Sequence, residues 1–311
     1  MFKALFIASR PKTLALALAG PIVAAAMASI LFQWDRSIFL WHALTTIFLQ
    51  ILSNYANDYG DFEKGTDQRA KRNDRALTAG LISQTAMKKA IFTTATLAFL
   101  SGIALLNQSF SSNGIYFALF LIIGIAAIAA AIKYTMGASA YGYKSLGDVV
   151  VFLFFGPVAI LGGFYLHTHH LGLDILLISV AFGLFSVAVL NINNIRDIQS
   201  DRISNKKTLA NQWGKEKAIS YQRALLLTAW LLNVYVLVLR QLDLWGESKP
   251  LFKDIALLPI VFMPFLMAFL FHCSRLKTIE ERSDYNKQLR NIALLTLAFA
   301  LAWVLIGLLL F

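Results

Sequence analysis

Two clusters of asparagine and aspartate carry the spacing in this sequence that is best suited to chemistry. In the first, Asn54, Asn57, Asp58 and Asp61 occupy positions i, i+3, i+4 and i+7, which share one face of an α-helix. Asp67 follows a few residues later. Like charges at this spacing destabilise a helix by about 0.2–0.5 kcal/mol per pair unless a cation neutralises them. The cluster therefore predicts a cation site.

The second cluster has the same character. Asn193, Asp197 and Asp201 advance four residues at a time, again along one helical face. Both clusters contain Asn-x3-Asp, and they resemble a degenerate repeat. Carboxylate oxygens, completed by water and phosphate, are the ligands that Mg²⁺ prefers, whereas solvated helix ends would explain either cluster taken alone. The predicted Mg²⁺ ligands and catalytic residues are Asp58, Asp61, Asp67, Asp197 and Asp201.

Basic residues are interleaved with both acidic clusters. Arginine and lysine side chains are the usual partners of phosphate oxygens. Acids and bases mixed in this way fit a metal ion and cationic side chains around a diphosphate ester. The predicted diphosphate-binding residues are Asn54, Asn57, Lys64, Arg69, Arg72, Arg75, Asn193, Asn194, Arg196 and Lys206.

The elements that must position these clusters are membrane-spanning helices. The chain has 311 residues, of which 58% are hydrophobic and 14% charged, and its mean hydropathy is +0.64, outside the range of ordinary soluble domains. Its apolar runs are continuous and near 20 residues long, so they indicate helices rather than barrel strands. We predict one all-α integral-membrane domain over residues 1–311. Its nine spans are 14–32, 38–56, 90–107, 114–132, 149–167, 171–190, 224–240, 255–272 and 291–311.

The distribution of positive charge predicts the orientation. Of the 28 Lys and Arg residues, all but Arg36, Arg240, Lys249 and Lys253 fall on the side of the N-terminus and of both acidic clusters. By the positive-inside rule this side is cytoplasmic and the C-terminus is opposite. The net charge of +11 thus reflects topology, and no basic module for binding nucleic acid is expected.

Further motifs accompany the clusters. They are Arg10-Pro11-Lys12-Thr13-Leu14, Asn57-Asp58-Tyr59-Gly60-Asp61 with Lys64-Gly65-x-Asp67, Tyr141-Gly142-Tyr143 with Leu146-Gly147-Asp148, Phe154-Phe155-Gly156, and Asn193-Asn194-x-Arg196-Asp197-x3-Asp201. Together they resemble the UbiA family of intramembrane prenyltransferases. The lengthened step from Asp61 to Asp67 is most similar to the menaquinone-pathway branch, which prenylates 1,4-dihydroxy-2-naphthoate. Residues beyond about 215 add no recognised motif.

The resemblance implies nine helices around a central cavity in a bacterial plasma membrane. It also implies Mg²⁺ and an allylic polyprenyl diphosphate, whose prenyl group passes to 1,4-dihydroxy-2-naphthoate with loss of CO₂ and diphosphate to give demethylmenaquinol. Aromatic rings near the third cytoplasmic loop can shield an allyl cation, although anchoring at the membrane interface is the favoured explanation for each ring taken alone. Asp148 can orient the acceptor or simply begin a helix. The expected acceptor and prenyl contacts are Arg10, Lys12, Tyr134, Tyr141, Tyr143, Lys144, Asp148, Phe152 and Phe155.

Three other functions remain open at this point. A UbiA-type enzyme can use 4-hydroxybenzoate or homogentisate as its aromatic acceptor. A membrane transporter is disfavoured because the predicted spans carry few ionisable residues at mid-depth. A CDP-alcohol phosphatidyltransferase also uses membrane aspartates and Mg²⁺, but its Asp-Gly-x2-Ala-Arg type of cluster is missing from the sequence.

Overall fold

Helices form the architecture of the described part of the chain, with no named strand. The computed structural model describes residues 2–69, 75–111, 113–137, 140–244 and 252–310, with the backbone only at residues 69, 241–244, 252–260, 309 and 310. The elements are α1 (Phe2–Ala8), α2 (Pro11–Leu31), α3 (Arg36–Glu63), α4 (Thr66–Arg69), α5 (Gln84–Phe110), α6 (Gly114–Lys133), η1 (Tyr141–Tyr143), α7 (Gly147–Leu153), η2 (Phe154–Gly162), α8 (Gly163–Thr168), α9 (Leu173–Arg196), α10 (Ile198–Ile203), α11 (Leu209–Trp213), α12 (Lys215–Leu244), α13 (Phe252–Thr278) and α14 (Arg282–Leu310).

The long helices lie over the predicted spans. Among the described residues, eight helical segments are long and apolar enough to cross a membrane: α2, α3, α5, α6, residues 147–168, α9, α12 and α14. α13 covers the remaining predicted span, 255–272, without being one of these eight. The all-α membrane fold is confirmed, and the number of spans agrees to within one.

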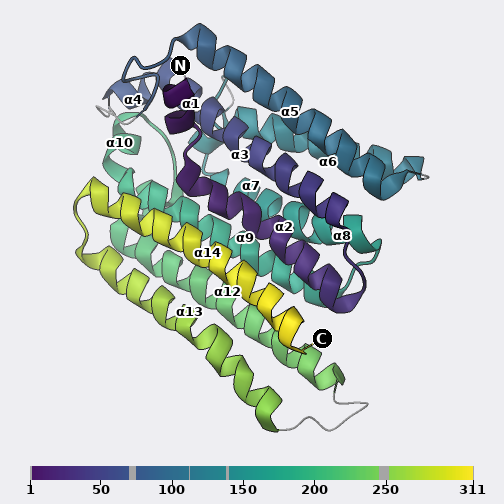
Figure 1. Cartoon of the computed structure of the whole chain (residues 1–311). Coiled ribbons are helices and arrows are strands. Elements are labelled where there is room, and N and C mark those ends of the chain that lie inside the picture. Colours follow the sequence, from purple (N-terminus) through teal and green to yellow (C-terminus); the bar gives the residue numbers. More distant parts are fainter. Residues whose placement is uncertain (1, 70–74, 112, 138–139, 245–251, 311) are drawn as a thin grey trace.

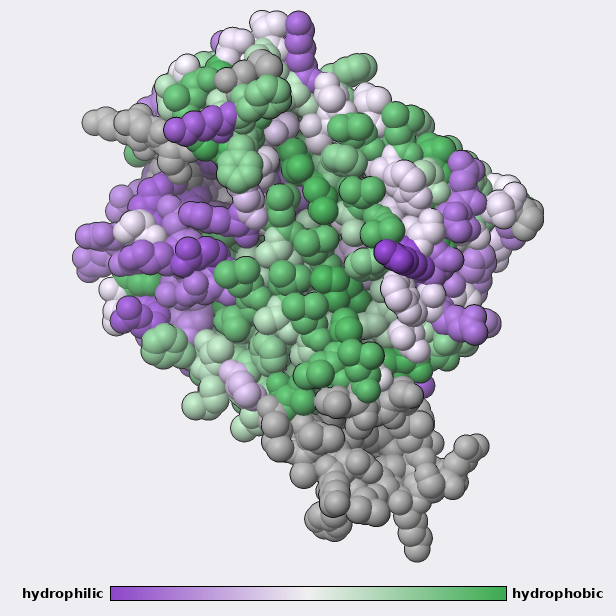
Figure 2. All heavy atoms as spheres, viewed as in Figure 1, coloured by the Kyte–Doolittle hydropathy of each residue, from purple (hydrophilic) through white to green (hydrophobic). Residues whose placement is uncertain are grey.

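The bundle has one polar end. Figure 1 shows the long helices running in a common direction, with α1, α4, α10 and the N-terminus at one end and the C-terminus at the other. Figure 2 shows an apolar belt between two more hydrophilic ends, the larger hydrophilic area lying at the α4 and α10 end. This pattern is expected of a bundle whose middle faces lipid.

α9 forms the centre of the main hydrophobic core. Its side chains Ile178, Phe182 and Phe185 are fully or almost fully buried and belong to the same core cluster as residues of α2, α12, α13 and α14. The ring centroids of Phe185 and Phe269 on α13 are 5.2 Å apart, within the range of a favourable aromatic pair. This packing fixes the helix that carries the second acidic cluster.

The segment 147–168 is helical throughout but changes its winding at Phe154–Gly162, where it is a π-helix containing Pro157. Proline lacks the N–H that an α-helix needs, and π-helical turns often occur at functional sites. A Cβ atom at Gly156 would lie 2.5 Å from the Ser179 carbonyl oxygen and 2.9 Å from Gly183 Cα. Glycine thus allows the close approach of η2 to α9, as small residues do between membrane helices.

Both acidic clusters lie where long helices end. α3 continues to Glu63, past the predicted span, and carries Asn54 through Asp61 on regular helix. α9 ends at Arg196 and α10 begins at Ile198. The bonds from Asp197 N–H to Asn193 O (3.0 Å) and from Asp201 N–H to Asp197 O (2.8 Å) preserve the four-residue repeat across that junction.

Candidate active site

The two acidic clusters line one cavity of about 890 Å³ between the helices. The first contributes Asn54, Asn57 and Asp61 to its wall, and the second contributes Asn193, Asn194, Asp197 and Asp201. Below them the cavity continues between apolar side chains of α2, α5, α6 and η2. The site therefore has a charged mouth and a long apolar interior.

Asp61 is held by the segment that follows α6. The Tyr143 hydroxyl donates to Asp61 Oδ1 at 2.9 Å and lies 2.8 Å from the Thr66 hydroxyl. A Cβ atom at Gly60 would lie 2.7 Å from the backbone carbon of Thr135, so glycine allows this segment to approach α3. Thr135 Oγ1 in turn donates to Asn57 Oδ1 at 3.2 Å. Asp61 and Asn57 are thus oriented from one side.

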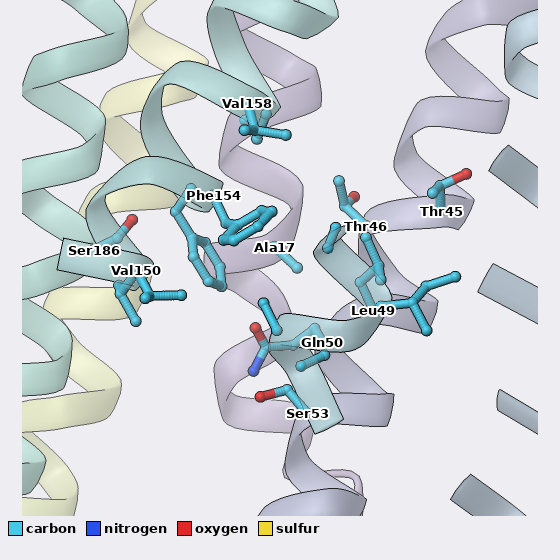
Figure 3. A pocket seen from close by; sticks show the side chains of 18 of the residues that line it. Ala17, Thr45, Thr46, Leu49, Gln50, Ser53, Val150, Phe154, Val158 and Ser186 are labelled. Atoms are coloured by element: carbon cyan, nitrogen blue, oxygen red, sulfur yellow. The ribbon is translucent and has the colours of Figure 1, made fainter. Parts of the chain in front are cut away.

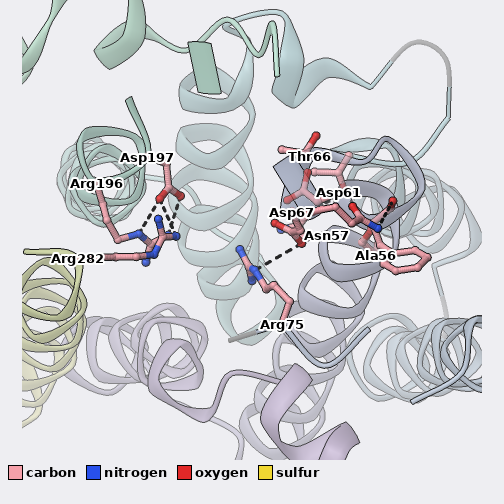
Figure 4. Close-up of polar contacts among 12 residues, drawn as sticks. Ala56, Asn57, Asp61, Thr66, Asp67, Arg75, Arg196, Asp197 and Arg282 are labelled. Carbon is pink, nitrogen blue, oxygen red and sulfur yellow. Dashed lines mark hydrogen bonds and ion pairs between the residues drawn. The ribbon is translucent and has the colours of Figure 1, made fainter. Parts of the chain in front are cut away.

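Asp58 and Asp67 lie behind this wall rather than on it. They are 1% and 0% exposed and are not among the cavity residues. Arg75 Nε lies 3.8 Å from Asp67 Oδ2, and Figure 4 shows Arg75 between the two acidic clusters. The charge of Arg10 acts on Asp58, and the backbone N–H groups of Leu77 and Ala76 approach the Asp58 carboxylate.

Asp197 is bound by two arginines from different helices. Arg196 donates to both carboxylate oxygens, at 2.9 and 2.8 Å, and Arg282 Nη2 lies 2.9 Å from Oδ1. Arg196 Nη1 donates to Asn286 Oδ1 at 2.6 Å. Figure 4 shows this group facing Asp61 and Asp67. Arg282 and Asn286 belong to α14, and sequence reasoning missed them because Arg282 counted only toward the positive charge of its loop.

Lys206 connects the two clusters electrostatically. It lines the cavity, and its ammonium lies 5.3 Å from the centre of the Tyr143 ring. Burial lowers the pKa of Lys206, but the charges of Asp61 and Asp201 and the neighbouring tyrosines raise it more, leaving the pKa above its ordinary value. Lys206 therefore remains a cation between two sets of carboxylates.

The predicted aromatic residues divide into two groups. Tyr134, Tyr141 and Phe155 line the cavity, and burial raises the pKa of Tyr134 to about 12, so its hydroxyl stays protonated. Tyr143 and Phe152 do not line it. The Lys64 ammonium lies 4.0 Å from the centre of the Tyr143 ring, so one face of this ring already contacts a cation of the protein.

The remaining predicted contacts are scattered. Arg10 lines the cavity, but Lys12, Lys64, Lys144 and Asp148 do not. Lys12 and Lys144 are exposed, and Asp148 accepts a hydrogen bond from the Tyr221 hydroxyl at 3.1 Å, which favours the structural interpretation of this carboxylate. The side chain of Arg69 and the whole of Arg72 lie outside the described residues.

The donor chemistry of the cavity fits Mg²⁺ that is shared with a phosphate ligand. Within the described part of the chain, no group of three or more carboxylate, histidine or cysteine side chains lies close enough to enclose an ion alone. Mg²⁺ is commonly bound through one or two carboxylates plus water and substrate phosphates. Asp61 on one side and Asp197 with Asp201 on the other provide ligands of that kind.

Comparison with known proteins agrees with this geometry. The UbiA prenyltransferase family model matches residues 13–289. The chain belongs to this family. It is 41% identical over 238 residues to 1,4-dihydroxy-2-naphthoate octaprenyltransferase of Escherichia coli strain K12, covering 76% of this chain and 77% of that protein. It is 36% identical over 236 residues to the protein of the same name from Mycobacterium tuberculosis, covering 74% and 76%.

A solved structure shows the same fold. A UbiA homolog from Archaeoglobus fulgidus, bound to GPP and Mg²⁺, superposes with a TM-score of 0.65 at 15% identity, covering 97% of this chain and 99% of that one. The likeness extends over α13 and the other helices beyond residue 215, where we recognised no sequence motif. This chain is therefore a membrane-embedded enzyme of the UbiA prenyltransferase type.

Proposed function

We propose that this enzyme transfers a polyprenyl group from an allylic polyprenyl diphosphate to 1,4-dihydroxy-2-naphthoate, with loss of CO₂ and diphosphate, giving demethylmenaquinol. The observation that carries the proposal is that one cavity is lined by Asp61, Asp197 and Asp201 and continues between apolar side chains. Its charged mouth suits a diphosphate and its interior suits a prenyl chain. The names of the curated relatives support the naphthoate acceptor.

The diphosphate would be bound at the mouth of the cavity. Lys206, Arg75 and Arg196 line it there and can donate charge-assisted hydrogen bonds to phosphate oxygens. Asp61, Asp197 and Asp201 would hold Mg²⁺, with Asp58 and Asp67 supporting them from behind. When bound, Mg²⁺ neutralises the charge that develops on the leaving diphosphate.

The reaction balances without an external base at the acceptor carbon. The allylic C–O bond breaks and diphosphate leaves with the electron pair. The carboxylated ring carbon forms the new C–C bond, and CO₂ departs from that carbon in place of a proton. Asp148 is therefore not needed as a base, which agrees with the hydrogen bond that its carboxylate accepts from the Tyr221 hydroxyl. The walls must exclude water from the allyl cation, and the rings of Tyr134, Tyr141 and Phe155 lie where they can stabilise it.

The membrane setting follows from the charge distribution. We propose a single integral domain in the bacterial plasma membrane, with membrane lipid around the apolar belt of Figure 2 and the N-terminus and the cavity mouth facing the cytoplasm. The donor and the product would then keep their prenyl chains within the bilayer during catalysis.

The proposed function is tested by offering purified protein a polyprenyl diphosphate, Mg²⁺ and one acceptor at a time. Dihydroxynaphthoate should give a prenylated, decarboxylated product and release of diphosphate, and removal of Mg²⁺ by a chelator should stop both. Product from 4-hydroxybenzoate or homogentisate but not from dihydroxynaphthoate would overturn the acceptor assignment. Uptake of a substrate by proteoliposomes without diphosphate release would support a transporter instead.

A further inference from the structure

The α3 wall of the cavity stays polar below the acidic cluster, inside the membrane-spanning part of the protein. Gln50 lies four residues before Asn54 and seven before Asn57, on the same helical face, and all three residues line the cavity. Figure 3 shows the Gln50 amide pointing away from α3 toward the side of the pocket where Phe154 lies. A hydrocarbon chain has no hydrogen bond to offer such a group.

Hydrogen bonds determine which end of the Gln50 amide is left without a partner among the described residues. Gln50 Nε2 donates to Thr13 Oγ1 at 3.2 Å and to Asn54 Oδ1 at 3.4 Å. The hydroxyl proton of Thr13 is used toward Arg10 O at 2.9 Å, and Asn54 Nδ2 also donates to Thr13 Oγ1, at 3.1 Å. Thr13 Oγ1 must therefore accept from Gln50. A flipped amide would place two acceptor oxygens against each other.

The other end of this amide is an unused acceptor. Gln50 Oε1 is buried and has no hydrogen-bond partner among the described residues. A buried acceptor without a partner costs about 1–3 kcal/mol. A ligand that supplies an O–H donor at this point would recover part of that cost.

We propose that Gln50 Oε1 accepts a hydrogen bond from the ring hydroxyl of the aromatic acceptor that lies remote from its carboxylate. The inference rests on the proposed function and adds the residue that orients the acceptor ring. Gln50 is about 10 Å below Asn57 along the helix axis, at 1.5 Å per residue. A naphthoate ring therefore fits between Gln50 and a diphosphate held at the level of Asn57 and Asp61.

The charge of the cavity sets the direction of the ring. An acceptor carboxylate would be repelled by Gln50 Oε1, which has only lone pairs to offer, and attracted toward Arg10 and Lys206, which line the cavity. The carboxylated carbon then faces the allylic carbon at the mouth, while the 4-hydroxyl points down to Gln50. This is the orientation that carbon–carbon bond formation with loss of CO₂ requires.

The test compares wild-type protein with Gln50→Leu in steady-state kinetics with dihydroxynaphthoate. The variant should raise KM for dihydroxynaphthoate by about 3- to 10-fold, the effect of one neutral hydrogen bond, and leave KM for the polyprenyl diphosphate unchanged. The inhibition constant of 1-hydroxy-2-naphthoate, which lacks the 4-hydroxyl, should be the same in both proteins. Thr96→Val is the control, because Thr96 does not line the cavity and its hydroxyl donates to Phe92 O within α5, and both KM values should stay unchanged.

The possible outcomes separate the inference from the proposed function. An unchanged KM for dihydroxynaphthoate in Gln50→Leu overturns the inference. An inhibition constant for 1-hydroxy-2-naphthoate that rises as much as the KM for dihydroxynaphthoate also overturns it, because Gln50 would then act only through Thr13 and Asn54. If Gln50→Leu does not fold, the test is made on wild-type protein with 4-methoxy-1-hydroxy-2-naphthoate, which has no O–H at that position. Its inhibition constant should be about 3- to 10-fold higher than the dissociation constant of dihydroxynaphthoate. Equal binding overturns the inference. No product from dihydroxynaphthoate with wild-type protein contradicts the proposed function itself, and the inference with it.

Discussion

Arg282 Nη2 lies 2.9 Å from Asp197 Oδ1 and thereby ties the start of α14 to the second acidic cluster. Arg196 already covers both oxygens of the same carboxylate. Two arginines together fix the orientation of a carboxylate that lines the cavity. Arg282 therefore acts on a diphosphate at the cavity mouth through the Asp197 that it holds.

Replacing Arg282 by alanine should therefore weaken donor binding more than acceptor binding. We expect KM for the polyprenyl diphosphate to rise about 10-fold, since a hydrogen bond to a charged group contributes about 1.5–3 kcal/mol and Arg282 is partly exposed. KM for dihydroxynaphthoate should change little. Arg290→Ala, an exposed residue of the same helix, is the control and should behave as wild type. Equal KM values for the donor in Arg282→Ala and wild type would show that Arg282 does not contribute to donor binding.

Tyr143→Phe tests how Asp61 is oriented. The substitution removes the hydroxyl that donates to Asp61 Oδ1 at 2.9 Å and contacts Thr66, while the ring under Lys64 remains. We expect kcat/KM for the donor to fall about 5- to 10-fold, the effect of about 1 kcal/mol. Tyr141→Phe is the comparison, because its hydroxyl donates to the Ala130 carbonyl oxygen at 2.8 Å and does not reach Asp61. An equal loss in both variants would indicate a general packing effect.

Gly156→Ala tests the close crossing of η2 and α9. The added Cβ would lie 2.5 Å from the Ser179 carbonyl oxygen, so the helices must separate, at a cost of about 1–3 kcal/mol for an overpacked site. Thermal unfolding in detergent should show a lowered Tm. Gly124→Ala in α6 meets no described atom within 4 Å and should leave Tm unchanged or slightly higher. An unchanged Tm in Gly156→Ala would mean that the crossing tolerates a wider separation.

Helical spacing was sufficient to predict that Asn57 and Asp61 share a face and that Asp197 and Asp201 do, because this depends only on local periodicity. The apolar runs likewise predicted the long helices. Which carboxylates reach the cavity depends on tertiary packing, so the positions of Asp58 and Asp67 behind the wall did not follow from the sequence. Arg282 comes from a helix that is distant in the sequence, and no short sequence motif indicates its contact with Asp197.

The most direct test of the account is whether Asp61 and Asp197 hold one diphosphate together through Mg²⁺. Binding of a non-reactive prenyl thiodiphosphate should be measured by calorimetry in wild type, Asp61→Asn, Asp197→Asn and the double variant, with and without Mg²⁺. We predict that Mg²⁺ strengthens wild-type binding by at least about 10-fold, that each single variant loses most of this gain, and that the double variant loses little more, as coupled sites do. Mg²⁺-dependent binding of wild-type strength in either single variant would contradict the account.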